Sequence, residues 1–340
     1  MDAEVTSMPV SLALIGAGRI GQVHASAVGA HHDARLVALH EPNADLAAAT
    51  AARHGASVRS IEDILGDAGI DAILICSPTN THADLIQRGV DAGKAVFCEK
   101  PIDLSLERAT ACVEHVERAG GTLMLGFNRR FDPSFASVRR AAAEGVVGEV
   151  EHVTIVSRDP SPPPADYIKV SGGMLRDMTI HDFDMARFVL GEEPDTVFAT
   201  GSVLVDPKIG ELGDIDTATL VLTTPSGRQC TIVNSRRATY GYDQRLEVAG
   251  SKGIASAQNE RPLSVELATS QGFRQPPLHD FFMTRYTAAY AAEIAAFVDC
   301  VANGTAPSPD GRDGVAALRL AEAGVQSLRQ GRAVRLSEIG

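Results

Sequence analysis

Residues 10–21, VSLALIGAGRIG, join an apolar run to three glycines with G-x-G-x-x-G spacing, at Gly16, Gly18 and Gly21. The first glycine permits a tight turn, the second lets the backbone approach a pyrophosphate, and the third lets a helix pack closely on the strand. The N-terminus of that helix offers N–H groups to phosphates. The motif alone is weak, but the preceding strand pattern and the following helical segment, QVHASAVGA, supply the context that a dinucleotide site requires.

Outward from this motif, residues 10–127 alternate short β-rich runs with segments of helical composition. The strand candidates are VSLALIG, RLVALHE, DAILICSP, AVFCEKP and TLMLGF, and segments such as NADLAAATAARHG lie between them. This alternation predicts βαβ units and a parallel sheet with helices on both faces. We therefore predict a doubly wound Rossmann domain over residues 1–127 of an α/β protein.

The pattern changes near Asp132, and residues 128–340 are predicted to form a second α/β domain that binds substrate and forms oligomers. The runs DIDTATLVLTTPSGRQCTIVNSRRA and QRLEVAGSKGIASA alternate with period two, and TPSG is typical of a hairpin turn. They predict an open, predominantly antiparallel sheet. The last segments, FFMTRYTAAYAAEIAAFVDCVANG and GRDGVAALRLAEAGVQSLRQG, are read as two helices that can pack back on the first domain.

Composition limits the functions that fit. A chain of 340 residues suggests two domains, and no apolar run approaches the roughly 18 residues of a membrane helix. A formal charge of −12 opposes binding to nucleic-acid phosphates. The five cysteines are scattered without a C-x-x-C pair, and the acidic N-terminus lacks a secretion-signal pattern. We expect a cytoplasmic protein with a small-molecule substrate, no metal, and no nucleic-acid or membrane partner.

An acidic residue, Glu41, ends the second predicted strand, 25 residues after Gly16. A carboxylate near this spacing accepts hydrogen bonds from the adenosine ribose and repels a 2′-phosphate, so NAD is predicted over NADP. The neighbouring His40 and Pro42 leave open a shifted turn in which Glu41 does not reach the ribose. For the glycine motif itself, the alternative is a turn in an α/β domain that binds no ligand.

The segment CSPTNTHAD follows a predicted strand, and strand ends in open α/β sheets line the ligand crevice. Its polar side chains are therefore predicted to meet the cofactor, although His82 equally fits a surface position at a helix N-terminus. The predicted cofactor-binding residues are Gly16, Gly18, Arg19, Ile20, Gly21, Glu41, Ser77, Pro78, Thr79, Asn80, His82 and Glu99.

Lys100 directly precedes Pro101 at the end of the run AVFCEKP. The residue before a proline is pushed towards extended geometry, so Lys100 is held out of its strand towards the crevice. A cis peptide before Pro101 would fix that direction further. The alternative is a surface lysine at a strand end.

Residues 172–188, GGMLRDMTIHDFDMARF, add three aspartates and a histidine to an apolar helical pattern. Asp177 and His181 are four residues apart, so on one α-helix their side chains lie nearly above one another. Such an aspartate orients the imidazole and favours its protonated form, which makes the ring a stronger base. Alcohol oxidation needs a base for the hydroxyl proton, and a cation such as Lys100 stabilises the developing alkoxide. If Asp177 and His181 are considered without the other motifs, the alternative is an aspartate at a helix N-terminus beside a surface histidine.

Together, GAGRIG, CEKP, GFNRRFD and GGMLRDMTIHDFDMARF resemble the glucose-fructose oxidoreductase/inositol dehydrogenase family over nearly the whole chain. The glycine motif is shared by many enzymes, whereas EKP marks the family and SRDPSPPPADYI is more specific to its bacterial inositol dehydrogenases. The resemblance implies NAD-dependent oxidation of the axial 2-hydroxyl of myo-inositol to 2-keto-myo-inositol (scyllo-inosose). It also implies a homotetramer that assembles through the exposed face of the second domain's sheet.

The resemblance also implies roles for individual residues. The family's catalytic lysine, aspartate and general-base histidine match Lys100, Asp177 and His181, and its substrate-site arginine matches Arg129. Further polar residues come from SRDP and from one tyrosine of TYGYD. The predicted substrate-binding residues are Lys100, Asn128, Arg129, Ser157, Asp159, Asp177, His181, Tyr240 and Tyr242.

Two departures from the family pattern leave the substrate open. Some inositol dehydrogenases have a histidine where Ser157 stands and a methionine near Asn128. The enzymatic alternatives are therefore scyllo-inositol, another inositol isomer or an aldose, with the same mechanism. A non-catalytic NAD-dependent sensor is the alternative of another class, but it would be favoured by loss of Lys100, Asp177 or His181, and all three are present.

Overall fold

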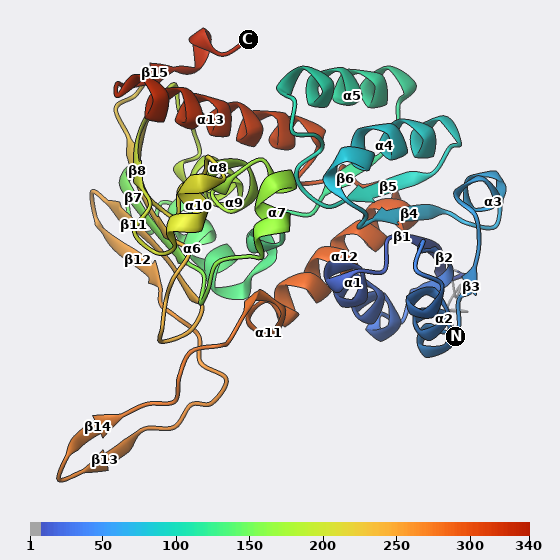
Figure 1. The fold of residues 1–340 in the computed structure, drawn as a ribbon, viewed down its shortest axis with the longest axis horizontal. Coiled ribbons are helices and arrows are strands. Elements are labelled where there is room, and N and C mark those ends of the chain that lie inside the picture. The colour runs from blue at the N-terminus through green and yellow to red at the C-terminus, as the bar shows by residue number, and fades with distance from the viewer. Residues whose placement is uncertain (1–7) are drawn as a thin grey trace. The chain divides into compact units, whose positions relative to one another are not determined.

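The computed structural model describes residues 8–340, and the chain divides into two compact units (Figure 1). The first unit comprises Met1–Phe131 and Ala288–Val315, and the second comprises Asp132–Thr287 and Ala316–Gly340. The boundary lies four residues after the predicted one, and Ala288–Val315 falls in the first unit. The expectation that the chain carries no secretion signal concerns its N-terminal segment, and the first seven residues lie outside the described part of the structure.

The first unit is built on a six-stranded parallel sheet with the order β3-β2-β1-β4-β5-β6. This order confirms the doubly wound prediction. All five predicted strands are present, and only β3 was not predicted, because two residues show no periodicity. The strands are β1 (Val10–Ile15), β2 (Ala34–His40), β3 (Ser57–Val58), β4 (Ala72–Ile75), β5 (Ala95–Cys98) and β6 (Leu123–Leu125).

Helices cover both faces of this sheet, so every residue of β1 is buried. The connecting helices are α1 (Arg19–Ala30), α2 (Ala44–His54), α3 (Ile61–Gly66), α4 (His82–Asp91) and α5 (Leu106–Ala119), with short 3-10 turns at Thr79–Thr81 and Asn128–Phe131. A later helix, α12 (Thr287–Asn303), belongs to the same core, because Ile294, Phe297 and Val298 pack among the buried residues of β1, α1 and α2. This packing explains why a C-terminal segment belongs to the first unit.

The second unit is built on a seven-stranded sheet with the order β12-β11-β7-β10-β9-β8-β15. Only β7 and β10 pair in parallel, so the sheet is predominantly antiparallel, as predicted. The predicted TPSG hairpin joins β9 to β10, with Gly227 at a φ of 91°. The strands are β7 (Val150–Arg158), β8 (Thr196–Ser202), β9 (Thr217–Thr223), β10 (Gln229–Ser235), β11 (Asp243–Gly250), β12 (Gly253–Ala257) and β15 (Val334–Arg335).

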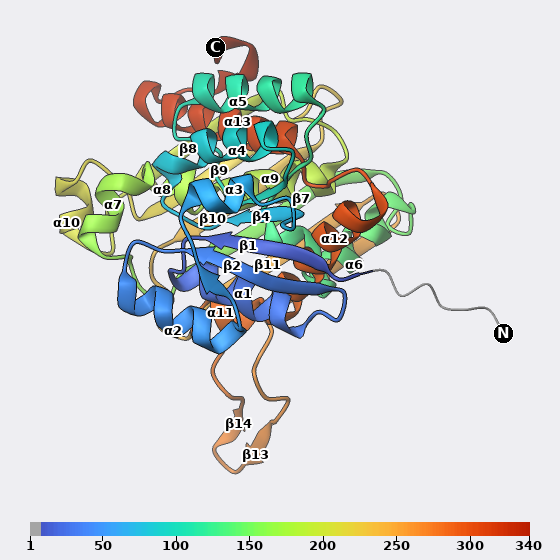
Figure 2. The same cartoon turned by 90° about the vertical axis from the view of Figure 1, so that its right-hand side faces the viewer.

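Helices pack on one face of this sheet, and a separate hairpin of β13 (Leu267–Thr269) and β14 (Gly272–Arg274) projects from the second unit (Figure 2). A Cβ atom at Gly324 would lie 2.9 Å from Leu175 Cδ1, so α13 packs closely on the segment that holds Asp177. The helices are α6 (Pro133–Ala143), α7 (Ala165–Ser171), α8 (Met174–Asp177), α9 (Ile180–Leu190), α10 (Pro207–Glu211), α11 (Phe282–Arg285) and α13 (Gly311–Gln330), with a 3-10 turn at Leu336–Glu338. The division between the units falls within α13.

The prediction of one continuous helix over residues 172–188 is wrong, because α8 ends at Asp177 and α9 begins at Ile180. Between them, the N–H of Thr179 donates to Met174 O, five residues back, and the N–H of Asp182 donates to Thr179 O, three residues back. The Thr179 hydroxyl donates to Asn234 Oδ1 in β10 at 2.7 Å. This contact with a strand distant in sequence holds the irregular turn.

The C-terminal helix predicted over residues 281–304 is likewise divided, into α11 and α12, at Tyr286. Tyr286 is buried, and its ring lies edge-on to that of Tyr242 at 6.0 Å. No helix among residues 8–340 has the length and apolar character needed to cross a membrane.

Candidate active site

The glycine loop in the first unit depends on the absence of side chains at two positions. Gly16 has a φ of 93°, and a Cβ atom there would lie 2.6 Å from the Ser77 backbone nitrogen. At Gly21, a Cβ atom would lie 2.2 Å from the Gly16 carbonyl oxygen. At Gly18, by contrast, a Cβ atom would meet no heavy atom within 4 Å. Gly16 and Gly21 are therefore required by close packing, whereas Gly18 leaves open space at the start of α1.

The N-terminus of α1 fits an anionic ligand. Its N-cap residue, Gly18, makes no side-chain capping hydrogen bond, so no side chain of the cap competes for the first N–H groups of the helix. Such groups bind phosphates when a loop allows close approach. The residues present therefore fit the pyrophosphate of a dinucleotide.

Glu41 lies directly beside this loop. Its Oε2 atom accepts a hydrogen bond from the Ala17 backbone N–H at 2.8 Å, and its Oε1 atom accepts one from the Asn43 N–H at 2.9 Å. The carboxylate thus ties the end of β2 to the glycine loop. Each oxygen retains a further lone pair, so the geometry is compatible with the predicted bonds to ribose hydroxyls.

His82 is buried, with 2% of its surface exposed, so the alternative of a surface histidine is wrong. Its Nδ1 atom lies 2.8 Å from Pro101 O and its Nε2 atom lies 2.8 Å from Ser77 O. Burial lowers the pKa of His82, whereas both carbonyl contacts act to raise it, and the net shift is downward. His82 therefore links the loop after β4 to the loop that contains Lys100.

Lys100 is partly exposed, and the peptide bond between Lys100 and Pro101 is cis, which confirms that part of the prediction. Glu99 was predicted to contact the cofactor, but its Oε1 atom lies 2.7 Å from Nε2 of the buried His24. Asn128 and Arg129, predicted to contact substrate, are both buried in the short turn after β6.

In the second unit, Asp177 is held by residues that the sequence did not reveal. Its Oδ1 atom accepts a hydrogen bond from the Tyr167 hydroxyl at 2.8 Å, and its Oδ2 atom lies 3.5 Å from Nη2 of Arg236. Arg236 is buried and also lies 3.9 Å from Asp214 Oδ2. These partners are 10 to 59 positions away in sequence, so no local spacing could have indicated them.

His181 is partly buried in the first turn of α9, where its N–H donates to Met178 O at 3.3 Å. Because the helix is broken before Ile180, the four-residue spacing does not place Asp177 and His181 on successive turns of one helix. The two residues belong to consecutive elements of the same unit, and their proposed cooperation depends on this turn rather than on helical stacking.

Other residues that were predicted to bind substrate form hydrogen bonds within the second unit. The Ser157 hydroxyl is buried and donates to Asp182 Oδ1 at 2.6 Å, while Asn234 donates to Asp182 Oδ2 at 2.8 Å. Tyr240 is half exposed and donates to Asp243 at 2.6 Å, whereas Tyr242 is buried. Asp159 is partly exposed at the end of β7. Ser157 is thus buried whereas Asp159 is partly exposed, so only Asp159 is open to contact with a ligand from solvent.

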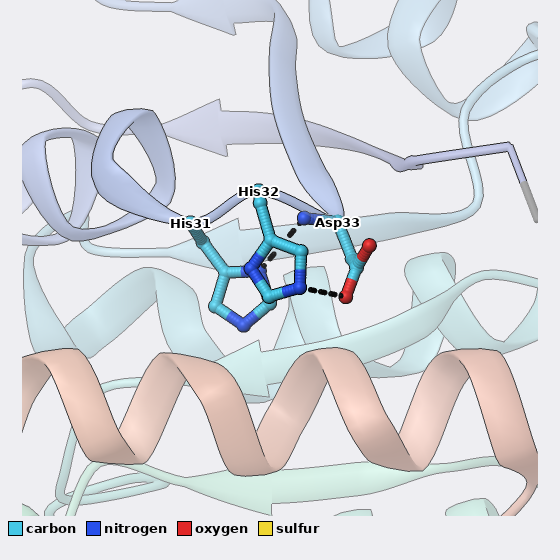
Figure 3. A group of neighbouring side chains, drawn as sticks. All are labelled: His31, His32 and Asp33. Atoms are coloured by element: carbon cyan, nitrogen blue, oxygen red, sulfur yellow. Dashed lines mark hydrogen bonds and ion pairs between the residues drawn. The ribbon is translucent and has the colours of Figure 1, made fainter. Parts of the chain in front are cut away.

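One group of metal-ligating side chains, His31, His32 and Asp33, lies at the turn between α1 and β2 (Figure 3). The two rings stack at 5.2 Å with 8° between their planes, and one ligand atom of each of the three residues lies within 4.8 Å of the others. His32 Nε2 is 2.8 Å from Asp33 Oδ2, and the Asp33 N–H donates to His31 Nδ1. We assign this exposed group no metal role.

Comparison with known families agrees with this architecture. Residues 10–127 match the oxidoreductase family with an NAD-binding Rossmann fold, and residues 135–256 match the GFO/IDH/MocA C-terminal domain. The chain belongs to the GFO/IDH/MocA oxidoreductase family, and its first unit is the NAD-binding Rossmann domain of that family.

Individual relatives are similar over nearly their full lengths. The chain is 58% identical to an inositol 2-dehydrogenase of Rhizobium meliloti, over 97% of this chain and 100% of the relative. The crystal structure of a myo-inositol dehydrogenase from Corynebacterium glutamicum superimposes with a TM-score of 0.94 at 45% identity, covering 97% and 99% of the two chains. That of a Lactobacillus casei scyllo-inositol dehydrogenase with bound NAD(H) and scyllo-inositol gives 0.90 at 27% identity, covering 97% and 99%.

Proposed function

We propose that this protein is an NAD-dependent inositol 2-dehydrogenase that oxidises the axial 2-hydroxyl of myo-inositol to 2-keto-myo-inositol (scyllo-inosose). The observation that carries the proposal is 58% identity over the full length of an inositol 2-dehydrogenase. The presence of Lys100, Asp177 and His181 supports it further, because these residue types supply the cation and the base that the reaction requires.

In the proposed mechanism, NAD accepts the hydride that leaves C2 of the inositol ring. The α1 N-terminus binds the pyrophosphate and Glu41 binds the adenosine ribose. His181 takes the proton of the 2-hydroxyl as the C–O bond becomes a carbonyl, and the Lys100 ammonium stabilises the negative charge that develops on the oxygen. Tyr167 and Arg236 hold the carboxylate of Asp177, which we propose positions the hydroxyl and the imidazole.

The test of substrate is NAD reduction by the purified protein with myo-inositol, scyllo-inositol, other inositol isomers and aldoses. We expect the highest kcat/KM with myo-inositol and NAD. A higher kcat/KM with scyllo-inositol would assign the alternative isomer, and a large preference for an aldose would overturn the inositol assignment. Absence of turnover with every polyol, together with normal NAD binding, would favour a non-catalytic sensor.

Replacing Glu41 by alanine is expected to weaken NAD binding. The change removes the acceptor of the Ala17 N–H as well as the proposed ribose contact, and hydrogen bonds to charged groups contribute about 1.5–3 kcal/mol. We therefore expect a Kd for NAD that is about 10- to 100-fold higher, and a smaller preference for NAD over NADP. Isothermal titration with both cofactors measures this effect. Asp45→Ala, an exposed acid in α2, is the matched control and should bind NAD as the wild type does.

We also propose a homotetramer that assembles through the outer face of the second unit's sheet. Paired residues form a row across this face, in which Phe198 pairs with Val221 and Val221 with Thr231. Phe198 is 42% exposed, so a partner sheet on this face would remove its apolar surface from water. Size-exclusion chromatography with light scattering measures the molar mass of the assembly. A wild-type monomer would contradict the proposal, and Phe198→Glu is expected to reduce the assembly size.

We propose a cytoplasmic location on the basis of cysteine chemistry. All five cysteines are buried and unpaired as disulfides, which suits a reducing compartment. Burial raises the pKa of the Cys112 thiol to about 12, so this thiol is poorly reactive. Cell fractionation tests the location, and recovery of the protein mainly in an extracellular or periplasmic fraction would contradict it.

A further inference from the structure

The turn that carries His181 is attached to the sheet by a side chain that would ordinarily cap a helix. Thr179 is the N-cap residue of α9, yet its side chain makes no capping hydrogen bond. Threonine at this position usually accepts such a bond through its side-chain oxygen. Here the Thr179 hydroxyl instead donates to Asn234 Oδ1 on β10 at 2.7 Å, and both residues are 0% exposed. The hydroxyl therefore joins the turn to the sheet.

Asp182 makes a second connection between the same turn and the same asparagine. Its Oδ2 atom accepts a hydrogen bond from Asn234 Nδ2 at 2.8 Å, and its Oδ1 atom accepts one from the Ser157 hydroxyl on β7 at 2.6 Å. Asp182 and Ser157 are likewise 0% exposed. The amide of Asn234 thus bridges Thr179 and Asp182.

Asn234 and Ser157 form a fixed support for these contacts. They are paired in register on the parallel strands β10 and β7, and Asn234 Nδ2 also donates to Ser157 O at 3.5 Å. Both strands lie inside the seven-stranded sheet, because each is hydrogen-bonded to a neighbour on either side. The Asn234 amide is therefore held at a fixed place in the sheet.

His181 lies between the two anchored residues of the turn. Its N–H donates to Met178 O at 3.3 Å, and the N–H of Asp182 donates to Thr179 O at 2.9 Å. From Met178 to Ala186, every residue other than His181 is buried, whereas His181 is partly exposed. The anchored turn thus leaves one side chain outside the core, and this side chain is the proposed base.

We propose that Asn234 is a positioning residue for the oxidation: by binding Thr179 and Asp182 together, it fixes the turn that places the His181 imidazole against the 2-hydroxyl of the substrate. This inference rests on the proposed function, because it takes His181 as the base. Proton transfer depends steeply on the distance between the base and the hydroxyl, so a small displacement of the turn lowers the rate.

Thr179→Val tests one anchor without the loss of a helix cap. The change keeps the shape of the side chain but removes the hydroxyl that donates to Asn234, and this side chain makes no capping bond that could be lost. We expect kcat to fall about 10-fold, and Thr179→Ser, which retains a hydroxyl, to regain most of that loss. Thr305→Val removes an exposed hydroxyl that donates to Asp299 and is the matched control, which should keep the wild-type kcat.

The same substitution in a second background separates positioning from a general loss of structure. If Thr179 acts through His181, then Thr179→Val should have no further effect on kcat in the His181→Ala protein. A merely structural loss would instead lower kcat by the same factor in both backgrounds. That outcome would overturn the inference, as would a wild-type kcat in Thr179→Val alone.

An exchange of the two bridging groups tests Asn234 directly. Asn234→Asp alone places two carboxyl groups against each other, so kcat should fall about 10-fold or more. Addition of Asp182→Asn restores an amide donor between the two side chains, and it keeps an acceptor for each of the Thr179 and Ser157 hydroxyls. The double variant should therefore regain most of the lost kcat. A double variant no faster than Asn234→Asp would contradict the bridging role.

The placement of His181 can also be measured without substrate. Its ring gives the histidine NMR resonance that is absent from His181→Ala, and we expect Thr179→Val, but not Thr179→Ser, to shift this resonance. An unshifted resonance in Thr179→Val would overturn the inference. If the wild type reduces NAD with none of the polyols, the proposed function fails, and the resonance still decides whether the Asn234 contacts position His181.

Discussion

Replacing His181 by alanine is expected to lower kcat for myo-inositol oxidation by about 10²- to 10⁴-fold, the usual contribution of a positioned general base. The hydroxyl proton then has no acceptor at the moment when hydride leaves C2. The Kd for NAD should stay within about twofold of the wild-type value, because the proposed contacts with NAD, at the α1 N-terminus and Glu41, do not include His181. Steady-state kinetics at saturating substrate, together with a titration of NAD, separates the two effects.

The pH profile gives a second readout of the same variant. Only the neutral imidazole accepts a proton, so wild-type kcat should fall as pH decreases through the titration of the base, and His181→Ala should lack this acidic limb. His115→Ala is the matched control, because this histidine lies on α5 and contacts Asp91 Oδ1 at 2.7 Å, outside the proposed site and the proposed assembly face. Wild-type turnover in His181→Ala would remove the assignment of the base, and equal losses in both variants would indicate a general structural effect.

The sequence was sufficient for the parts of the fold that depend on local pattern. The glycine spacing and the five apolar runs predicted the parallel sheet, because buried strands, tight turns and helix N-termini each require particular residues at short range. Glu41 was placed correctly at the end of β2, beside the glycine loop, for the same reason. In the second unit, period-two alternation and the TPSG turn predicted the antiparallel pairing of β9 with β10.

Features that depend on distant contacts could not be predicted in this way. The apolar pattern of residues 172–188 indicates one helix, but the hydrogen bond from Thr179 to Asn234 in β10 fixes a break that local periodicity does not record. His82 illustrates the same limit, because its burial between Ser77 O and Pro101 O depends on two loops that meet only in the folded unit. Arg236, which approaches Asp177, was missed because charge at a strand end is common on protein surfaces.

Ser157 shows how such contacts bear on substrate choice. The resemblance placed this residue in the substrate site, whereas the structure places its hydroxyl against Asp182 in the interior. Asn234 completes the environment of the same carboxylate and joins it to Thr179. A serine at this position therefore has a structural partner that the sequence alone did not indicate.

The second large expected effect is a loss of stability when a buried ion pair at the start of the second unit is broken. Asp132 Oδ2 lies 2.6 Å from Nη1 of Arg285, and the two side chains are only 2% and 1% exposed. The other oxygen of Asp132 caps α6 by accepting hydrogen bonds from the N–H groups of Ser134 and Phe135. Arg285 also contacts Glu260, but that carboxylate is half exposed, so Asp132 is the principal buried counter-charge.

Replacing Asp132 by alanine is therefore expected to reduce the free energy of unfolding by about 3–5 kcal/mol for the broken ion pair, with about 1 kcal/mol more for the lost helix cap. Most of the loss arises because the Arg285 guanidinium stays buried without its partner, so adding Arg285→Met should recover part of it. Denaturant unfolding measures these differences. Asp166→Ala, which breaks the exposed pair with Lys169, should leave the unfolding midpoint unchanged. Equal midpoints for Asp132→Ala and the wild type would show that the pair is not the buried, mutually dependent contact that its geometry indicates.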